Sequence, residues 1–396
     1  MSLVSKAIEA NLEQGSWIRD LFEKGNQLRR IHGDDKVYDF SLGNPIIEPP
    51  KKFKENIKVL AESNSPHLHG YISNQGLPEA REKVADFLFS LYDKKFSADS
   101  IIMTVGAGGA LNVALKSIIN PGEEVIVLVP YFVEYKYYIE NMQGKPVFCE
   151  LNEDFQIDVK ALGEKISDKT KAIIVNTPHN PTGTILSNAS IKALGQLLKD
   201  KEEQFGTNIY LVYDAPYTQL TFDADKNDSP FDAYHRVIYA SSFSKDLGIA
   251  GERIGYIAID DQLEGHDLLM AALVFSNRTL GFVNAPVFMQ RVLAMTDDLV
   301  TEQEEYKKRR DLVVEILEDA KFNFITPQGG FFVFPKSPIP DDVEFCKFAA
   351  DEYNILLVPG TGFGCPGYFR MSFSVDLAML ERAREPFKAL NSHFVK

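Results

Sequence analysis

Cysteine is scarce in this chain of 396 residues, which contains only Cys149, Cys346 and Cys365. Their spacing matches no metal-binding or redox motif, and a small, odd number of thiols is typical of a reduced cytoplasmic protein rather than a disulfide framework. His67 and His69 have no obvious third ligand nearby, so we interpret them as loop histidines and expect no metal site.

Long apolar runs and a surplus of positive charge are also missing. No uninterrupted apolar stretch approaches the roughly 20 residues that a membrane-spanning helix needs. The first residues, Met1 to Ile8, lack a basic segment followed by an apolar run, so a secretory signal is not indicated. We therefore expect a soluble, cytoplasmic protein that does not bind membranes.

The net charge of -14 limits the partners of the chain. Such a negative charge excludes sequence-independent binding to nucleic acid backbones, which depends on clustered lysine and arginine. It also repels anionic small molecules at long range. An anionic substrate must therefore be captured by specific arginines at short range.

The middle of the chain alternates apolar, β-prone segments with helical ones. Helix-period segments lie at 110–119, 191–203 and around 267–272. This alternation predicts an α/β fold with a mostly parallel sheet sandwiched by helices. The expected strands are Ile101–Val105, Glu124–Val129, Ala172–Asn176, Ile209–Tyr213, Val237–Ser241 and Ile254–Ile259.

The two ends of the chain predict a smaller α/β unit, and the length of 396 residues favours two or three domains. Residues 43–50 are rich in glycine and proline, which suit a boundary better than a regular element. We expect residues 1–44 and 296–396 to form the small domain and residues 45–295 the large one. The elements expected at the ends are a helix at 12–31, a strand at 38–42, a long helical region at 283–319, strands at 329–334 and 368–374, and helices at 343–353 and 377–390.

The most informative motif is Ser241-Ser242-Phe243-Ser244-Lys245, which follows the apolar segment 236–240. Lys245 therefore leaves the carboxyl end of a buried strand, where open α/β sheets place their ligands. A lone lysine is more often a solvated surface charge. The residues that accompany Lys245 along the chain make the functional interpretation the better one.

Asp214 and Tyr217 come directly after another expected strand, Ile209–Tyr213. A carboxylate there needs a cationic or donor partner, and a protonated pyridine nitrogen is one such partner. The alternative is a helix cap or loop residue. Tyr217 suits a donor to a ring phenolate oxygen, although taken alone it is more typical of a core residue.

Asn180 lies in Asn176-Thr177-Pro178-His179-Asn180-Pro181-Thr182-Gly183, where two prolines and a glycine fix the turn. The Asn180 side-chain amide is thus held rigidly beyond the end of a strand. There it is suited to donate, together with Tyr217, a hydrogen bond to a ring phenolate oxygen. The commoner fate of such an asparagine is to bond to its own backbone. Both interpretations stay open on the sequence alone.

A glycine-rich turn, Thr104-Val105-Gly106-Ala107-Gly108-Gly109, follows a strand and opens a helix. Backbone N–H groups at such a position bind oxyanions at the positive end of the helix. Ser242, Ser244 and Arg253 supply the hydroxyl donors and the fixed positive charge that a phosphate requires.

Two more residues complete the candidate set. Phe132 is placed to stack on an aromatic ring, although an aromatic residue after a strand usually belongs to the core. Arg370 lies within an apolar strand and needs an anionic partner, which is either a carboxylate ligand or an internal salt bridge. The whole set suits an anionic, aromatic aldehyde held as a Schiff base on lysine, which is pyridoxal 5′-phosphate (PLP).

In this combination the chain resembles the class I/II PLP-dependent aminotransferases of fold type I, which are aspartate aminotransferase-like. The resemblance extends from Leu42-Gly43-Asn44-Pro45 to Arg370-Met371-Ser372. The motifs that carry it are Tyr71 with Gly76-Leu77-Pro78-Glu79-Ala80-Arg81, Gly106-Ala107-Gly108, Asn180-Pro181-Thr182-Gly183, Asp214-Ala215-Pro216-Tyr217, Ser242-Phe243-Ser244-Lys245, Arg253 and Arg370. Two positions depart from the family pattern, because Gly109 replaces a bulkier residue and Phe132 replaces a tyrosine or tryptophan.

The resemblance implies a role for each residue. Lys245 is similar to the Schiff-base lysine and proton carrier, Asp214 to the pyridinium partner, and Arg370 with the Gly43 backbone to the α-carboxylate receptor. Asn180 and Tyr217 match the ligands of the ring hydroxyl. The phosphate-binding positions are those of Ala107, Gly108, Ser242, Ser244 and Arg253, together with Tyr71 from the neighbouring subunit of a homodimer.

The activity that the resemblance implies is ping-pong transfer of an amino group between an amino acid and a 2-oxo acid. Aspartate with 2-oxoglutarate is the pair we expect, with Arg278 reading the distal carboxylate. For Arg278 the alternative is a surface or interface salt bridge. Alternatives for the whole chain are a PLP-dependent β-lyase, an aminotransferase for aromatic or aliphatic amino acids and, more remotely, a PLP sensor without turnover.

Overall fold

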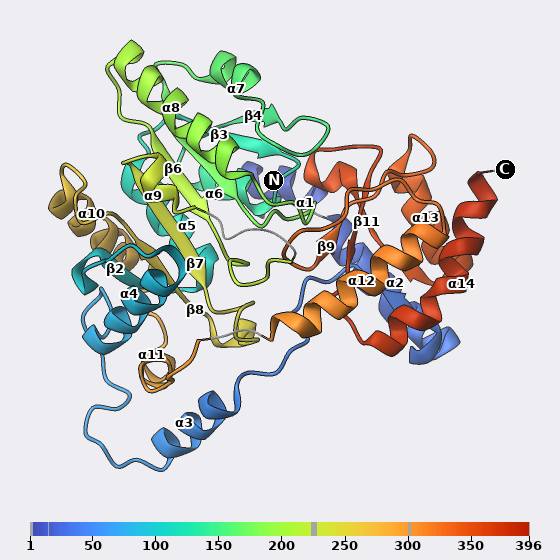
Figure 1. Cartoon of the computed structure of the whole chain (residues 1–396), viewed down its shortest axis with the longest axis horizontal. Helices are drawn as coiled ribbons and strands as arrows, with labels where there is room; N and C mark the ends of the chain where they lie inside the picture. Colours follow the sequence, from blue (N-terminus) through green and yellow to red (C-terminus); the bar gives the residue numbers. More distant parts are fainter. Residues whose placement is uncertain (1–2, 15, 223–227, 300–301, 396) are drawn as a thin grey trace.

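The computed structural model describes residues 3–14, 16–222, 228–299 and 302–395. Its largest sheet has seven strands in the order β2-β8-β7-β6-β5-β3-β4 (Figure 1). Strand β8 runs antiparallel to both neighbours, and the other pairs are parallel. The strands are β2 (Ile101–Val105), β3 (Glu124–Val129), β4 (Lys145–Glu150), β5 (Thr170–Asn176), β6 (Tyr210–Asp214), β7 (Val237–Ser242) and β8 (Ile254–Ala258).

Helices cover both faces of this sheet, which confirms the predicted α/β fold. Alternate residues of one strand point to opposite faces, so Ile101 and Met103 of β2 belong to one apolar cluster and Ile102 to the other. No helix in the described ranges is long and apolar enough to cross a membrane. On one face lie α5 (Gly106–Ile118), α6 (Glu134–Asn141) and α10 (His266–Thr279), and on the other α4 (Pro78–Tyr92), α8 (Asn188–Phe205) and α11 (Val287–Ala294).

A second apolar core unites the two ends of the chain, on the right in Figure 1. Phe40, from the N-terminal segment, lies 5.6 Å from Phe387 between ring centroids, and Phe322 lies 5.5 Å from Phe369. The same part of the molecule contains a small sheet of order β11-β12-β9, to which Phe369 belongs, and a parallel pair, β1 with β10. The elements are α2 (Ser16–His32), β1 (Tyr38–Asp39), α12 (Gln303–Asp319), β9 (Phe332–Val333), α13 (Asp342–Tyr353), β10 (Ile355–Leu356), β11 (Val358–Pro359), β12 (Phe369–Ser372) and α14 (Leu377–Phe394).

Several expected elements are shorter or divided. The helix expected at 12–31 is replaced by α1 (Lys6–Gln14) and α2, with Gly15, a poor helix former, between them in the sequence. The helical region expected at 283–319 contains two helices, α11 and α12. It begins later than expected, because Val283 has a left-handed φ of 63° and Pro286 precedes α11. The strand expected at 38–42 pairs over two residues only.

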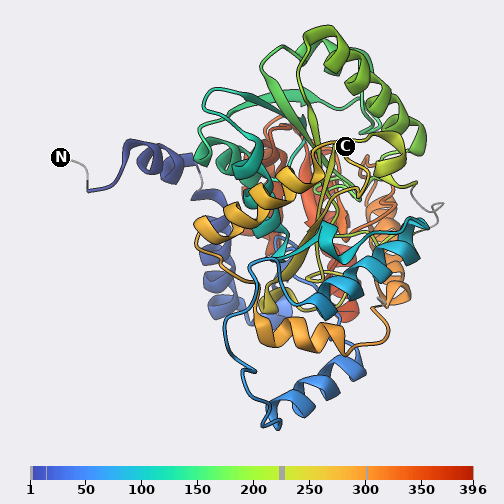
Figure 2. The same cartoon turned by 90° about the vertical axis from the view of Figure 1, so that its left-hand side faces the viewer.

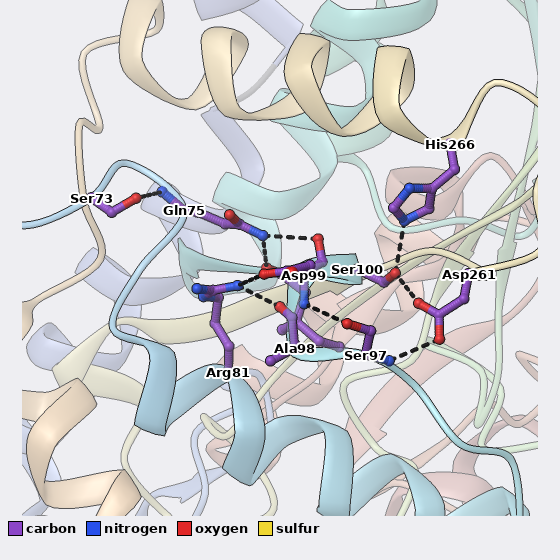
Figure 3. A network of polar contacts seen from close by, with 10 residues as sticks. Ser73, Gln75, Arg81, Ser97, Ala98, Asp99, Ser100, Asp261 and His266 are labelled. Atoms are coloured by element: carbon purple, nitrogen blue, oxygen red, sulfur yellow. Dashed lines mark hydrogen bonds and ion pairs between the residues drawn. The ribbon is translucent and has the colours of Figure 1, made fainter.

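A polar network fixes the entry to β2 (Figure 3). Arg81 of α4 donates to the Ala98 carbonyl oxygen at 2.6 Å and forms an ion pair with Asp99 at 3.1 Å. Next to them, the Ser100 hydroxyl oxygen lies 2.7 Å from Nε2 of His266, the first residue of α10. The network therefore joins helices from both faces at the strand that leads into α5.

Candidate active site

A cavity of about 650 Å³ opens where β5, β6 and β7 end, and residues of the small sheet form its far wall. Parallel strands end at the same edge of a sheet, so residues far apart in the sequence meet there. The cavity brings together Gly43, Ala107, Gly108, Phe132, Asn180, Asp214, Tyr217, Ser242, Ser244, Lys245, Arg253 and Arg370, all of which the sequence had nominated.

Lys245 lies just beyond β7, and its Nζ donates to the Gly43 carbonyl oxygen at 2.7 Å. The same Nζ lies 5.3 Å from the centroid of the Phe331 ring. Burial, followed by the positive charges of Arg370 and Arg253, lowers the pKa of Lys245 to about 8. A neutral, nucleophilic amine is therefore accessible near physiological pH.

Asp214 is the last residue of β6, so it is a strand residue rather than a helix cap. The Tyr135 hydroxyl donates to its Oδ2, and Asn176 Nδ2 donates to its backbone oxygen at 2.9 Å. Its Oδ1 is buried with no hydrogen-bond partner among the described residues. Burial raises the pKa of Asp214 to about 7, against the opposing effect of the Tyr135 hydrogen bond. Such a group needs a cationic donor to complete it.

Arg370 of β12 is held by neutral acceptors. It donates from Nη1 to Asn180 Oδ1 at 3.0 Å and from Nη2 to the Ser41 carbonyl oxygen at 2.9 Å. Its guanidinium carbon lies 4.4 Å from the Phe332 ring centroid, and burial lowers its pKa to about 10. No acidic side chain in the described ranges forms an ion pair with Arg370, so the internal salt bridge considered from the sequence is not seen there.

The opposite end of the cavity combines donors suited to an oxyanion. Helix α5 begins at Gly106, whose φ of 66° favours glycine and where a Cβ would lie 2.7 Å from Arg253 Nη2. The buried Ser242 and Ser244 line the same cavity. Backbone N–H groups at the helix start, hydroxyls and a guanidinium together form an anion cradle, whose donors are of the kind that a phosphate requires.

Aromatic side chains form much of the remaining wall. Tyr217 is 6 % exposed and its ring meets that of Phe331 edge-on, with centroids 5.3 Å apart. It is thus a core residue and a cavity residue at once. Phe132 packs edge-on against Tyr135, with centroids 5.5 Å apart. Both side chains therefore pack in the core and line the cavity, and their contact with a cofactor ring stays a prediction.

The cavity residues that the sequence reasoning did not single out include Tyr135, Tyr138 and Asn176. Asn176 Oδ1 accepts a hydrogen bond from the Asn180 backbone nitrogen at 2.8 Å, which fixes the predicted turn. The available signal for the tyrosines was the density of aromatic residues at 131–138, directly after β3. Their direction depends on how α6 packs against the sheet.

Tyr71 and Arg278 do not line the cavity of their own chain. Tyr71 is 93 % exposed, although its neighbour Ser73 is anchored by a hydrogen bond of 2.7 Å from Asn284 Nδ2 to its carbonyl oxygen. Arg278 is exposed on α10, with its guanidinium carbon 5.3 Å from the Phe275 ring centroid. Both side chains point outward from a fixed part of the molecule.

Residues 35–387 match the family described as aminotransferase class I and II. The chain belongs to this family. It is an aminotransferase, as the sequence predicted, and enzymes of this family depend on PLP.

Curated relatives and solved structures agree with this assignment. A probable aspartate aminotransferase of Methanocaldococcus jannaschii is 33% identical over 356 residues, which cover 87% of this chain and 91% of that protein. A crystal structure of an amino transferase from Eubacterium rectale matches with a TM-score of 0.94 and 34% identity, covering 100% of both chains. The aspartate aminotransferase of Thermotoga maritima matches with a TM-score of 0.86 and 28% identity, over 98% of this chain and 99% of that one.

Proposed function

We propose that this aminotransferase binds PLP in the cavity and exchanges an amino group between an amino acid and a 2-oxo acid. The observation that carries the proposal is the convergence of Lys245, Asp214 and Arg370 on one cavity. The buried, unpartnered Oδ1 of Asp214 needs a cationic donor, and the anion cradle needs a phosphate. PLP meets both needs at once.

Each end of PLP has suitable ligands in the proposal. Asp214 would hold the protonated ring nitrogen, Asn180 and Tyr217 the ring hydroxyl, and Phe132 the face of the ring. Ala107, Gly108, Ser242, Ser244 and Arg253 would hold the phosphate. When bound, PLP supplies the electron sink that stabilises negative charge at the substrate Cα.

The protein itself moves the proton and orients the substrate. Lys245 would take the proton from the substrate Cα as a general base, for which its pKa of about 8 is well suited. Arg370 would bind the substrate α-carboxylate as a fork, beside the Gly43 backbone. In the second half-reaction the same groups would act on the 2-oxo acid in reverse, which makes the kinetics ping-pong.

Aspartate with 2-oxoglutarate is the substrate pair that we propose. Three relatives that are 28% to 30% identical to this chain are named as aspartate aminotransferases, and their names support this proposal. In this proposal Arg278 of a second copy reads the distal carboxylate, because a guanidinium matches a carboxylate in geometry and charge.

We further propose a homodimer in which Tyr71 reaches the phosphate of the neighbouring subunit. Its 93 % exposure on an anchored segment suits contact with a second copy. Helix α1 supports the same idea, because it projects from the body of the chain with Ile8 and Leu12 about half exposed (Figure 2). The proposed domains remain 1–44 with 296–396, and 45–295.

The deciding assay supplies the protein and PLP with aspartate, aromatic and aliphatic amino acids, each with 2-oxoglutarate. Glutamate formation supports a transaminase, and the best amino acid identifies the donor. Pyruvate and ammonia, formed from donors with a leaving group on the β-carbon, would support a β-lyase instead. Cofactor binding without any product would support the sensor and overturn the proposed activity.

A further inference from the structure

The Tyr138 hydroxyl lies against the glycine turn at the start of α5. A Cβ built on Gly108 would be 3.1 Å from Tyr138 Oη and 4.0 Å from its Cζ. Tyr138 belongs to α6, and both Tyr138 and Gly108 line the cavity. The missing side chain at Gly108 therefore leaves room for a phenol at the anion cradle.

The electrostatic surroundings keep this phenol in its donor form. Burial, followed by the charges of Glu134 and Asp214, raises the pKa of Tyr138 to about 12, while Arg253 acts in the opposite direction. The hydroxyl thus lies within electrostatic reach of the arginine of the cradle. It makes no hydrogen bond to any residue of the described ranges, so its proton is available to a ligand.

We propose that Tyr138 is a further phosphate ligand, which donates its O–H to the PLP phosphate at Gly108. The inference rests on the proposed function and adds to it a residue that neither the motifs nor the fold had indicated. A side-chain O–H at this point complements the backbone N–H groups of α5, because an anion accepts several charge-assisted hydrogen bonds at once.

The test compares PLP with pyridoxal, which lacks the phosphate, in titrations of the cofactor-free full chain followed by absorbance. In Tyr138→Phe the affinity for PLP should fall about tenfold, as expected for one hydrogen bond to a charged group. The affinity for pyridoxal should not change. Tyr210→Phe is the matched control. Tyr210 is also half-buried, but it is the first residue of β6, whereas the cavity opens at the last residue of that strand.

A double-mutant cycle makes the test independent of general packing damage. Gly108→Ala should weaken PLP binding in the wild-type background, because its methyl group crowds the hydroxyl at 3.1 Å. It should weaken binding less in the Tyr138→Phe background, where the contact at 4.0 Å is ordinary van der Waals contact. Near-additive effects would overturn the proposed pairing of Gly108 with Tyr138.

The outcomes separate this inference from the proposed function. Equal losses for PLP and pyridoxal in Tyr138→Phe would mean that the phenol only packs, and no loss for either would mean that it does nothing; both results overturn the inference alone. Failure of the wild-type chain to bind PLP would overturn the proposed function itself.

Discussion

Asp214 and Tyr71 lie at opposite extremes of exposure, at 5 % and 93 %. Each is unusual for its residue type, because carboxylates are rarely buried and large aromatics are rarely left in water. The buried carboxylate has an oxygen with no described partner, whereas the exposed ring has no cover. In our proposal, the inner region, which is the cavity around Asp214, is completed by the protonated ring of PLP. The outer region, which is the surface around Tyr71, is completed by a second copy of the chain.

The inner region should be the more sensitive of the two, and its largest effect should come from Lys245. Lys245→Ala removes the only lysine Nζ bonded to Gly43 in the described ranges, and the proposed general base with it. We expect turnover to fall about 10⁴-fold, at the upper end for the loss of a general base. Glutamate formation measures turnover, and equilibrium dialysis should still detect bound PLP.

Lys171→Ala is the control for Lys245→Ala, because Lys171 contacts the Tyr210 ring away from the cavity. It should retain wild-type turnover. If turnover of the Lys245→Ala variant were within tenfold of the wild-type value, Lys245 would not be the proton carrier. The inner region would then not be the more sensitive of the two.

Asp214→Asn should change activity and stability in opposite directions. Without ligand, the folded Asp214 carboxyl keeps its proton up to about pH 7, while in the unfolded chain it ionises near its ordinary pKa of 3.8. Folding therefore takes up a proton between these values, and the free energy of unfolding falls as pH rises through that window. At about 1.4 kcal/mol per pKa unit, the loss is about 4 kcal/mol.

The asparagine variant lacks this ionisation. Relative to the wild type, the free energy of unfolding of its cofactor-free form should therefore increase as pH rises from 4 to 7, and the difference should stay constant above pH 7. Urea titrations of both proteins across this range measure the difference. Asp246, whose pKa burial raises to about 8, is present in both and leaves the comparison unaffected. Turnover of the variant should fall roughly a hundredfold, the equivalent of about 3 kcal/mol for a charged hydrogen bond. If the free energies of unfolding of the two proteins changed in parallel with pH, the raised pKa of the buried Asp214 carboxyl would be contradicted.

In the outer region, Tyr71→Ala should weaken PLP binding about tenfold, the loss of one hydrogen bond to a charged group. A mixture with Lys245→Ala distinguishes the two possible sites of action. If Tyr71 serves the neighbouring subunit, a mixed dimer contains one site with both residues, so activity rises above the sum of the separate variants. Absence of such recovery in mixed dimers, isolated by a different affinity tag on each variant, would place Tyr71 outside the site.

The smallest effect is expected for Arg278→Ala. Activity with aspartate should fall several-fold to tenfold, as for one partly solvated charge pair, while an uncharged amino acid should react as before. Arg382→Ala, which removes an exposed arginine on α14, controls for the change in net charge. Equal effects on both substrates, or none, would leave the proposed aspartate specificity without its main support.

Local patterns were sufficient for much of the fold. Strands β2 and β3 lie at the residues that the sequence predicted, because their apolar runs are continuous and bounded by turns. Edge strand β4 was missed, since most of its residues are at least partly exposed and carry no buried-strand pattern. The helical region predicted at 283–319 began too early, because a left-handed φ at Val283 is not visible in a periodicity.

The sequence by itself determined which residues gather at the cavity, as Asp214 and Lys245 illustrate. Asp214 ends one strand and Lys245 lies just beyond another, and the carboxyl ends of parallel strands meet at one edge, so strand order along the chain is enough to bring them together. Only the tertiary structure decided that one oxygen of Asp214 is bonded to Tyr135 while the other lacks a described partner, and that Tyr138 touches Gly108. These contacts depend on how α6 packs on the sheet, and packing joins residues whose separation in the sequence carries no signal.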